Sequence, residues 1–451
     1  MAYVSINPWS EETLARYETL STAVVQEKLH QSERAFREWR QTPLADRCQA
    51  LDNLAAILEQ QREQLARLIT AEMGKPITES RAEVDKCALC CRYYAQEAEQ
   101  MLQSREVPTQ AKRSFVRADP SGTILGIMPW NYPLWQVFRY AIPNLALGNA
   151  ILLRHASGTG GCAQAIASLF DTGAFPSGIF QNLYIDHESV EGVIAHRSVT
   201  GVTLTGSEQA GASVAALAGR YLKKSVMELG GSNAFLVLQG ADLQQAVDGA
   251  VQARMVNAGQ SCIAAKRFIV EAPVYDEFAD RFAQALSGLS IGDPMLEETR
   301  LGPLAREHFA QLLQEQLRDS LHAGAVLLAG GSCSGARHQA TLIGEVTPGM
   351  RAFDEETFGP LAALVRARDA EHALELANQS RFGLGMSIYS GSEAQALSLA
   401  ARAADGAVFV NAPVVSDPRL PFGGSKASGY GRELSQEGLL EFANIKTVVI
   451  R

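Results

Sequence analysis

The 451-residue sequence lacks the marks of several protein classes. Its lysines and arginines form no cluster and the net charge is −9, so we expect no nucleic-acid partner. The longest apolar stretch, residues 141–153, contains Pro143 and Gly148 and is too short to cross a bilayer. Residues 1–12 lack the apolar segment of a signal peptide. These absences predict a cytoplasmic protein that does not bind a membrane.

The cysteines have no disulfide-framework spacing. There are seven of them, an odd number, which favours a reducing compartment. Cys87, Cys90 and Cys91 lie close together, but no second Cys/His pair lies nearby, so we expect thiols within a helix and no metal site. The remaining cysteines are Cys48, Cys162, Cys262 and Cys333.

Cys262 lies between a glycine-containing polar loop, residues 257–261, and a basic apolar run typical of a strand. Only a thiolate attacks, and a free cysteine has a pKa of about 8.5, so a nucleophilic cysteine needs help to ionise. The backbone N–H groups of the loop, with Lys266 and Arg267, are candidates for that help. The alternative is a small buried apolar side chain.

The length predicts two or three domains. Apolar residues recur every three or four positions over residues 20–101, which predicts three amphipathic helices separated at Pro43 and at residues 74–76. The β-prone runs 113–118 and 123–128 flank a turn signal, so we expect a hairpin.

Short β runs then alternate with helical segments, which predicts a doubly wound, mostly parallel α/β sheet. The expected strands are 150–154, 201–204, 225–228 and 234–238, with helices beginning near Gly160, Ser207 and Ala241. A second α/β segment has strands at 267–270, 325–328, 361–365 and 408–410, and helices at 275–286 and 370–378. The terminal run 446–450 is a candidate edge strand for pairing with another subunit.

Two glycine-containing turns compete as phosphate sites. Gly158-Thr-Gly160-Gly-Cys-Ala163 follows a strand and fits a loose dinucleotide fingerprint. Gly206 and Ser207 also stand between a strand and a helix, where backbone donors face a phosphate. Either turn is also explained as a helix cap, so these patterns alone do not choose between them.

Two polar residues have the setting of catalytic groups. Glu228 ends an apolar strand before Gly230-Gly231, a position suited to a general base, although a solvated acid at a strand end is the alternative. Asn131 lies in a Pro-Trp-Asn-Tyr-Pro turn that would aim its amide at an oxyanion, and an Asx turn is the alternative.

Taken together, six segments resemble the aldehyde dehydrogenase superfamily in their family order. They are Pro129-Trp-Asn-Tyr-Pro133, Leu204-Thr-Gly-Ser207, Met227-Glu-Leu-Gly-Gly231, Asn257-Ala-Gly-Gln-Ser-Cys262, Glu356-Thr-Phe-Gly-Pro360 and Pro421-Phe-Gly-Gly-Ser-Lys426. The resemblance covers nearly the whole chain. It implies a Rossmann-type cofactor domain (residues 1–111 and 129–229), an α/β catalytic domain (230–420), and an oligomerisation hairpin and tail (112–128 and 421–451). It also implies a homodimer or homotetramer.

The resemblance assigns the catalytic roles. Cys262 would be the nucleophile, Glu228 the base that activates the deacylating water, and Asn131 an oxyanion donor together with the Cys262 backbone N–H. Glu228 favours hydrolysis over acyl transfer to coenzyme A, because relatives that use coenzyme A generally lack this acid. The residues that would contact the cofactor are Trp130, Arg154, Ser157, Gly206, Ser207, Leu229, Glu356 and Phe358.

Two departures from the family pattern bear on the cofactor and on proton transfer. Most relatives carry Lys-Pro-Ser and then an acid near the adenosine ribose, whereas this chain has Arg154-His-Ala-Ser157. An acid would repel a 2′-phosphate, while Arg154 and Ser157 would accept it, so we expect NADP or NAD as cofactor, with NADP slightly favoured. Tyr140 replaces a lysine thought to assist proton transfer, which leaves the proton relay open.

The substrate prediction depends on Arg139. The Trp135-Gln-Val-Phe-Arg139 segment looks most like the bacterial succinate-semialdehyde dehydrogenase branch, in which Arg139 would clamp the distal carboxylate of a semialdehyde. Alternatives are a surface arginine, another aliphatic or aromatic aldehyde as substrate, or a non-catalytic binding or structural protein that keeps the fold. The predicted substrate-binding residues are Trp135, Arg139, Ser261, Ser416, Arg419 and Phe422, with Ser425 as a further candidate.

Overall fold

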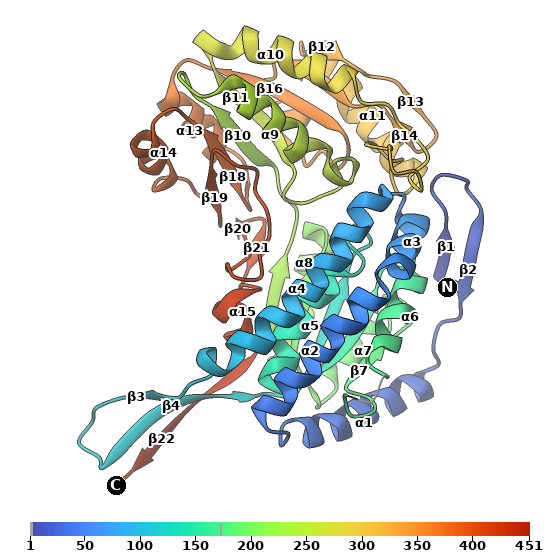
Figure 1. The fold of residues 1–451 in the computed structure, drawn as a ribbon, viewed down its shortest axis with the longest axis vertical. Coiled ribbons are helices and arrows are strands. Elements are labelled where there is room, and N and C mark those ends of the chain that lie inside the picture. The colour runs from blue at the N-terminus through green and yellow to red at the C-terminus, as the bar shows by residue number, and fades with distance from the viewer. Residues whose placement is uncertain (1–2, 172–173) are drawn as a thin grey trace.

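The computed structural model describes residues 3–171 and 174–451, which form two α/β units and a projecting β arm (Figure 1). An antiparallel pair, β1 (Tyr3–Ile6) and β2 (Thr13–Tyr17), opens the chain. Four helices follow, α1 (Thr22–Trp39), α2 (Leu44–Gln60), α3 (Arg62–Met73) and α4 (Ile77–Met101). The prediction of three helices was wrong because α2 and α3 are separated at Gln61, where no glycine or proline marks the break.

The first unit is built on a six-stranded sheet in the order β21-β9-β8-β5-β6-β7. Its strands are parallel except β21, and they confirm the predicted doubly wound arrangement. The strands are β5 (Thr123–Met128), β6 (Ala150–His155), β7 (Phe180–Asn182), β8 (Val199–Thr205), β9 (Lys224–Glu228) and β21 (Gly429–Tyr430). The associated helices are α5 (Trp135–Leu147), α6 (Gly160–Leu169), α7 (Val190–Ala195), α8 (Glu208–Arg220) and α15 (Ser435–Glu441).

The second unit is built on a seven-stranded sheet in the order β12-β15-β16-β11-β10-β18-β19. Its strands are β10 (Asn233–Val237), β11 (Ala265–Glu271), β12 (Val326–Ala329), β15 (Thr341–Gly344), β16 (Leu361–Ala367), β18 (Met386–Tyr389) and β19 (Val408–Val410). Its helices are α9 (Leu243–Met255), η1 (Val256–Gly259), α10 (Ala272–Ser287), α11 (Glu307–His322), α12 (Arg351–Asp354), α13 (Ala370–Asn378) and α14 (Glu393–Ala400). Two short antiparallel pairs complete it, β13 (Cys333–Ser334) with β14 (Arg337–His338) and β17 (Phe382–Gly383) with β20 (Ser425–Lys426).

The predicted hairpin of residues 113–118 and 123–128 was wrong. The first run forms β4 (Arg113–Pro120), which pairs with β3 (Arg105–Glu106) and β22 (Ala443–Ile450) in the projecting arm. The second run is β5, which lies between β6 and β8. Every residue of β5 is buried, as expected of a strand that is covered on both faces. Because these side chains are all apolar or small, the run is more stable in the interior of a sheet than in a projecting hairpin.

The terminal strand β22 pairs along its whole length with β4 of the same chain, and it lies at an edge of the three-stranded sheet. The predicted edge strand is therefore present, with one side already paired. Within the described residues, no helix is both long and apolar enough to cross a membrane.

Candidate active site

Cys262 lies on the loop between η1 and β11 of the second unit. Asn257, Ala258 and Gly259 are all left-handed, with φ of 55°, 50° and 73°. Such a conformation costs about 1 kcal/mol or more at a residue with a side chain, so neighbouring contacts must stabilise it. The Asn257 N–H donates to Glu79 Oε2 at 2.7 Å, and its side chain donates to the Asn131 carbonyl at 2.8 Å. These contacts fix the loop that positions Cys262.

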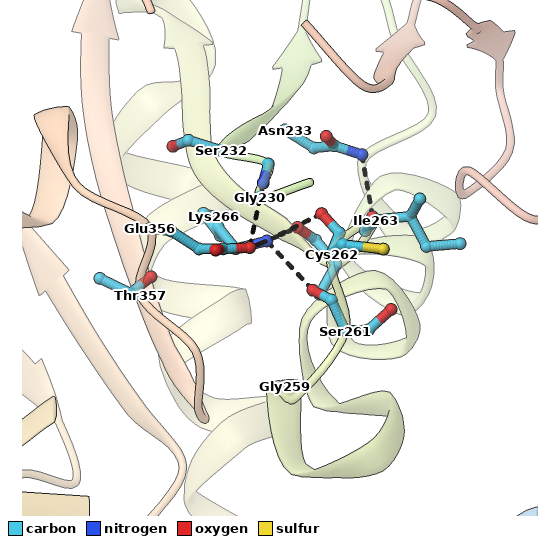
Figure 2. Close-up of polar contacts among 12 residues, drawn as sticks. Gly230, Ser232, Asn233, Gly259, Ser261, Cys262, Ile263, Lys266, Glu356 and Thr357 are labelled. Atoms are coloured by element: carbon cyan, nitrogen blue, oxygen red, sulfur yellow. Dashed lines mark hydrogen bonds and ion pairs between the residues drawn. The ribbon is translucent and has the colours of Figure 1, made fainter. Parts of the chain in front are cut away.

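Lys266 stabilises the backbone on one side of the cysteine. Its Nζ donates to the carbonyls of Ser261, Cys262 and Ala264 at 3.0–3.1 Å and lies 3.7 Å from Glu356 Oε1. Figure 2 shows the Cys262 sulfur pointing away from this ammonium group. Lys266 therefore orders the loop, and its charge acts on the thiol from the carbonyl side.

Arg267 does not have the predicted role near the thiol. Its guanidinium donates to the Ser232 carbonyl at 2.8 and 3.0 Å and to the carbonyls of Leu376 and Ala377 at 2.8 and 3.0 Å. Because those donors are occupied in the interior of the second unit, Arg267 is a structural residue.

The Cys262 thiol opens onto a cavity of about 220 Å³. The wall is largely apolar, with polar groups from Ser261, Ser416, Trp135, Arg139, Lys86 and Glu79 among its members. Burial raises the pKa of Cys262 to about 11, with Glu356 and Glu228 adding to the rise and Arg139 and Lys266 opposing it. Without a bound ligand, the thiol is therefore protonated near neutral pH.

This pKa gives a direct expectation for thiol chemistry. Alkylation of Cys262 by iodoacetamide in the ligand-free protein should accelerate about tenfold for each pH unit between about pH 7 and pH 9, because the thiolate is the reactive form. Mass spectrometry of the peptide that contains residue 262 measures the rate, and C262S gives the background. A rate that does not change over this range would contradict the raised pKa.

Asn131 reaches the cysteine loop, as predicted for an oxyanion donor. Its side-chain amide donates to the Gln260 carbonyl at 3.0 Å, and its Oδ1 accepts from Gln136 Nε2 at 3.0 Å. One N–H of the amide is thereby used and the group's orientation is fixed, which leaves its second N–H as the candidate donor to an oxyanion. The oxyanion role itself stays a prediction.

Glu228 ends β9 as predicted and is buried. Its Oε1 has no hydrogen-bond partner among the residues that the structure describes. Burial raises the pKa of Glu228 well above its ordinary value, Glu433 raises it further, and Arg139 opposes both. Glu228 is absent from the described wall of the cysteine cavity, but it lies close enough to raise the pKa of Cys262.

Arg139 lies in the cavity wall, but its charge is already engaged. It forms a buried ion pair with Glu433, its Nη2 donates to Thr205 Oγ1 at 3.2 Å, and its guanidinium lies 4.4 Å from the centre of the Phe422 ring. A surface arginine is therefore excluded. The predicted carboxylate clamp would require Arg139 to bind substrate while paired with Glu433.

The two glycine turns differ in what occupies their helix N-termini. At α6, the N–H groups of Gly161 and Cys162 donate to the Glu72 carboxylate at 2.8 and 2.9 Å, so that terminus already has an anion. At α8, Ser207 caps the helix and lines a second cavity of about 550 Å³, together with the ends of β5, β6 and β8. The α6 N-terminus is therefore occupied and the α8 N-terminus faces a cavity, and the phosphate role of the α8 turn stays a prediction.

Four further predicted cofactor residues make close contacts with other segments of the chain. Glu356 Oε1 accepts the Gly231 N–H at 3.0 Å, and a Cβ on Gly230 would come within 2.6 Å of Glu356 Oε2 (Figure 2). The Trp130 ring stacks on Phe309 and meets Phe358 edge-on, with ring centres 4.8 and 5.8 Å apart. Leu229 packs over Gly211 of α8, where a Cβ would come within 2.5 Å of the leucine.

The other substrate candidates separate into two groups. Trp135, Ser261, Ser416 and Phe422 line the cysteine cavity. Arg419 does not line it in the described structure: its side chain is 72% exposed and makes a two-pronged ion pair with Asp417. Ser425 donates to the Ala404 and Gly383 carbonyls instead.

Sequence reasoning missed Lys86 and Glu79, which lie on α4 and line the same cavity. Both lie in an amphipathic helix whose sequence predicts only a structural role. A lysine or glutamate in such a helix is expected to face solvent. No local signal identifies them, because their place in the wall results from how α4 packs on α5.

Comparisons with known proteins agree with this geometry. The aldehyde dehydrogenase family model matches residues 2–448. Succinate semialdehyde dehydrogenase [NAD(P)+] Sad of Escherichia coli (strain K12) is 45% identical over 448 residues, covering 99% of this chain and 97% of that protein. A probable succinate-semialdehyde dehydrogenase [NADP(+)] of Synechocystis is 46% identical over 453 residues, with full coverage of both chains.

Among solved structures, succinic semialdehyde dehydrogenase from Streptococcus pyogenes in complex with NADP+ superimposes with a TM-score of 0.97 at 36% identity, covering 100% of both chains. The family match and these relatives show that the chain is a dinucleotide-dependent oxidoreductase. The chain belongs to the aldehyde dehydrogenase family.

Proposed function

We propose that this enzyme oxidises succinate semialdehyde to succinate with NADP or NAD. The observation that carries this proposal is the largely apolar cavity of about 220 Å³, which has the Cys262 thiol in its wall together with two basic side chains, Lys86 and Arg139. A short aldehyde with a distal carboxylate matches that combination. Relatives more than 40% identical over nearly the whole chain are named for this activity.

The chemistry follows from the placement of three side chains. Cys262 would first release its thiol proton to solvent, the resulting thiolate would add to the aldehyde carbon, and the Asn131 amide with the Cys262 N–H would stabilise the oxyanion. The bound cofactor would supply the hydride acceptor, which leaves a thioester on Cys262. Glu228 would take a proton from water as the water attacks that thioester, the C–S bond would break, and the acid would leave.

The second cavity fits a cofactor with a 2′-phosphate. Arg154, near the end of β6, lines this second cavity. Its Nε is buried and has no hydrogen-bond partner among the described residues. Its Nη2 lies 3.4 Å from His187 Nε2, and Ser157 is exposed beyond the strand. Residues 154–163 contain no acid that would repel a phosphate.

The test of the proposed function compares substrates and cofactors. We expect kcat/KM for succinate semialdehyde to exceed that for butanal, and kcat/KM for NADP to be at least comparable to that for NAD. Arg154→Ala should lower kcat/KM for NADP about 10- to 100-fold and change NAD use little, since only NADP carries the phosphate. Arg197→Ala, at an exposed arginine paired with Glu33, is the control. A strong preference of the wild type for NAD would contradict the role of Arg154.

We also propose that the protein is a cytoplasmic homodimer or homotetramer. The support is the edge strand β22, on which Ile445, Val449 and Ile450 are 57%, 54% and 42% exposed. An exposed apolar edge strand is suited to association with another copy of the chain.

A further inference from the structure

Three groups from separate elements meet in the wall of the cysteine cavity. Lys86 comes from α4, Trp135 from the start of α5, and Ser416 from the segment between β19 and β20. The Ser416 Oγ accepts from Lys86 Nζ at 2.7 Å and from Trp135 Nε1 at 3.0 Å. The Lys86 ammonium also lies 4.5 Å from the centre of the Trp135 ring.

This arrangement leaves the Ser416 hydroxyl as a donor. A hydroxyl oxygen has two lone pairs and one proton, and both lone pairs of Ser416 are used by Lys86 and Trp135. The Ser416 proton has no acceptor in the described part of the chain. Lys86 likewise keeps N–H donors beyond the one it gives to Ser416. The cluster therefore presents several donors to the cavity without an acceptor for them.

Lys86 is also the cation in this wall whose charge is not paired. Of the two basic residues that line the cavity, Arg139 is paired with Glu433, whereas Lys86 has no carboxylate within 4.0 Å among the described residues. Burial, with a smaller effect from the nearby Arg139, lowers the pKa of Lys86 to about 8. An incoming anion would offset this cost of burying the charge.

The acids near Lys86 are engaged by other groups or partly neutral. Asp417, whose charge raises the pKa of Lys86, is ion-paired with Arg419. Glu83 is ion-paired with Lys75 and accepts the N–H groups of Leu134 and Trp135 at 2.8 and 2.9 Å. Burial raises the pKa of Glu79, also in the wall, to about 7, so about half of it is neutral near that pH. The local charge of the wall therefore favours an anion.

We propose that Lys86 and the Ser416 hydroxyl bind the distal carboxylate of the substrate, and that Trp135 positions Ser416 for this contact. The proposal rests on the proposed function and refines it, because it assigns the charge that selects a short aldehyde acid. Apolar side chains such as Val256, Ile263 and Val414 line the space shared with Cys262 and would contact the carbon chain. Arg139 then keeps its pair with Glu433.

The test is the ratio of kcat/KM for succinate semialdehyde to kcat/KM for butanal, measured with NADP. Lys86→Met should lower this ratio about 30-fold, mainly through KM for succinate semialdehyde, because a charged hydrogen bond is lost. Lys86→Arg should restore most of the ratio, and Ser416→Ala should lower it about tenfold. Lys28→Met is the matched control, since Lys28 is also partly buried and donates to a side-chain oxygen, Gln181 Oε1, at 2.8 Å.

The outcomes separate this proposal from the proposed function. A wild-type ratio near one overturns both the substrate assignment and the carboxylate site. A large wild-type ratio that Lys86→Met and Ser416→Ala both leave within threefold overturns the site alone and returns the role to Arg139. Circular dichroism and the melting temperature of each variant show whether it is folded. If Lys86→Met does not fold, the substrate ratio of Lys86→Arg is compared with that of Ser416→Ala instead.

Discussion

Cys262→Ala should lower kcat/KM for every aldehyde at least about 10⁴-fold, because removing a nucleophile abolishes the covalent route and leaves only binding and orientation. The reaction is followed by the absorbance of reduced cofactor. Cys262→Ser should be nearly as impaired, because a hydroxyl is a far weaker acid than a thiol and the burial that raises the pKa of Cys262 would disfavour an alkoxide at this position even more.

The control for this change is Cys333→Ala. Cys333 is also a partly buried free cysteine, but it lies on the short pair β13–β14 and is not among the described residues that line the cavity. We expect it to retain wild-type kinetics. Cofactor binding by Cys262→Ala, measured by fluorescence titration, should remain. Residual turnover above about 1% would show that Cys262 is not the nucleophile.

The sequence predicted best those elements whose pattern is complete within a short segment. Residues 408–410 and 370–378 were predicted with the bounds that the structure has, as β19 and α13. Both are short apolar or amphipathic segments with clear ends. The hairpin prediction failed because it relied on a local signal, the turn at residues 119–122. The long partner of β4 is β22, which lies at the far end of the chain.

The site residues were likewise predicted where their signal lies within a short segment. Cys262, Glu228 and Asn131 stand in recognisable motifs, and in the structure Asn131 is hydrogen-bonded to the loop that carries Cys262. The family resemblance already assigned Gly206 and Ser207 to the cofactor, whereas the contact of the α6 N-terminus with Glu72, a residue of α3, could not be predicted from the sequence. Such long-range placement depends on packing, which local periodicity does not encode.

Glu228→Gln should separate the two halves of the reaction. Gln keeps the size of the side chain and removes its capacity to accept a proton, so the thioester should form and then hydrolyse slowly. We expect a burst of reduced cofactor equal to about one equivalent per active site, followed by turnover lowered about 10²- to 10⁴-fold. Stopped-flow absorbance measures both phases.

The buried setting of Glu228 gives this variant a second signature. Because burial and Glu433 raise the pKa of Glu228, a growing fraction becomes the basic carboxylate as pH rises, and wild-type deacylation should accelerate with pH. The slow phase of Glu228→Gln should lack that Glu228-dependent rise. Hydroxylamine attacks a thioester without a general base, so it should restore turnover in the variant. Loss of the burst itself would instead place Glu228 before hydride transfer, as a group acting on the Cys262 thiol.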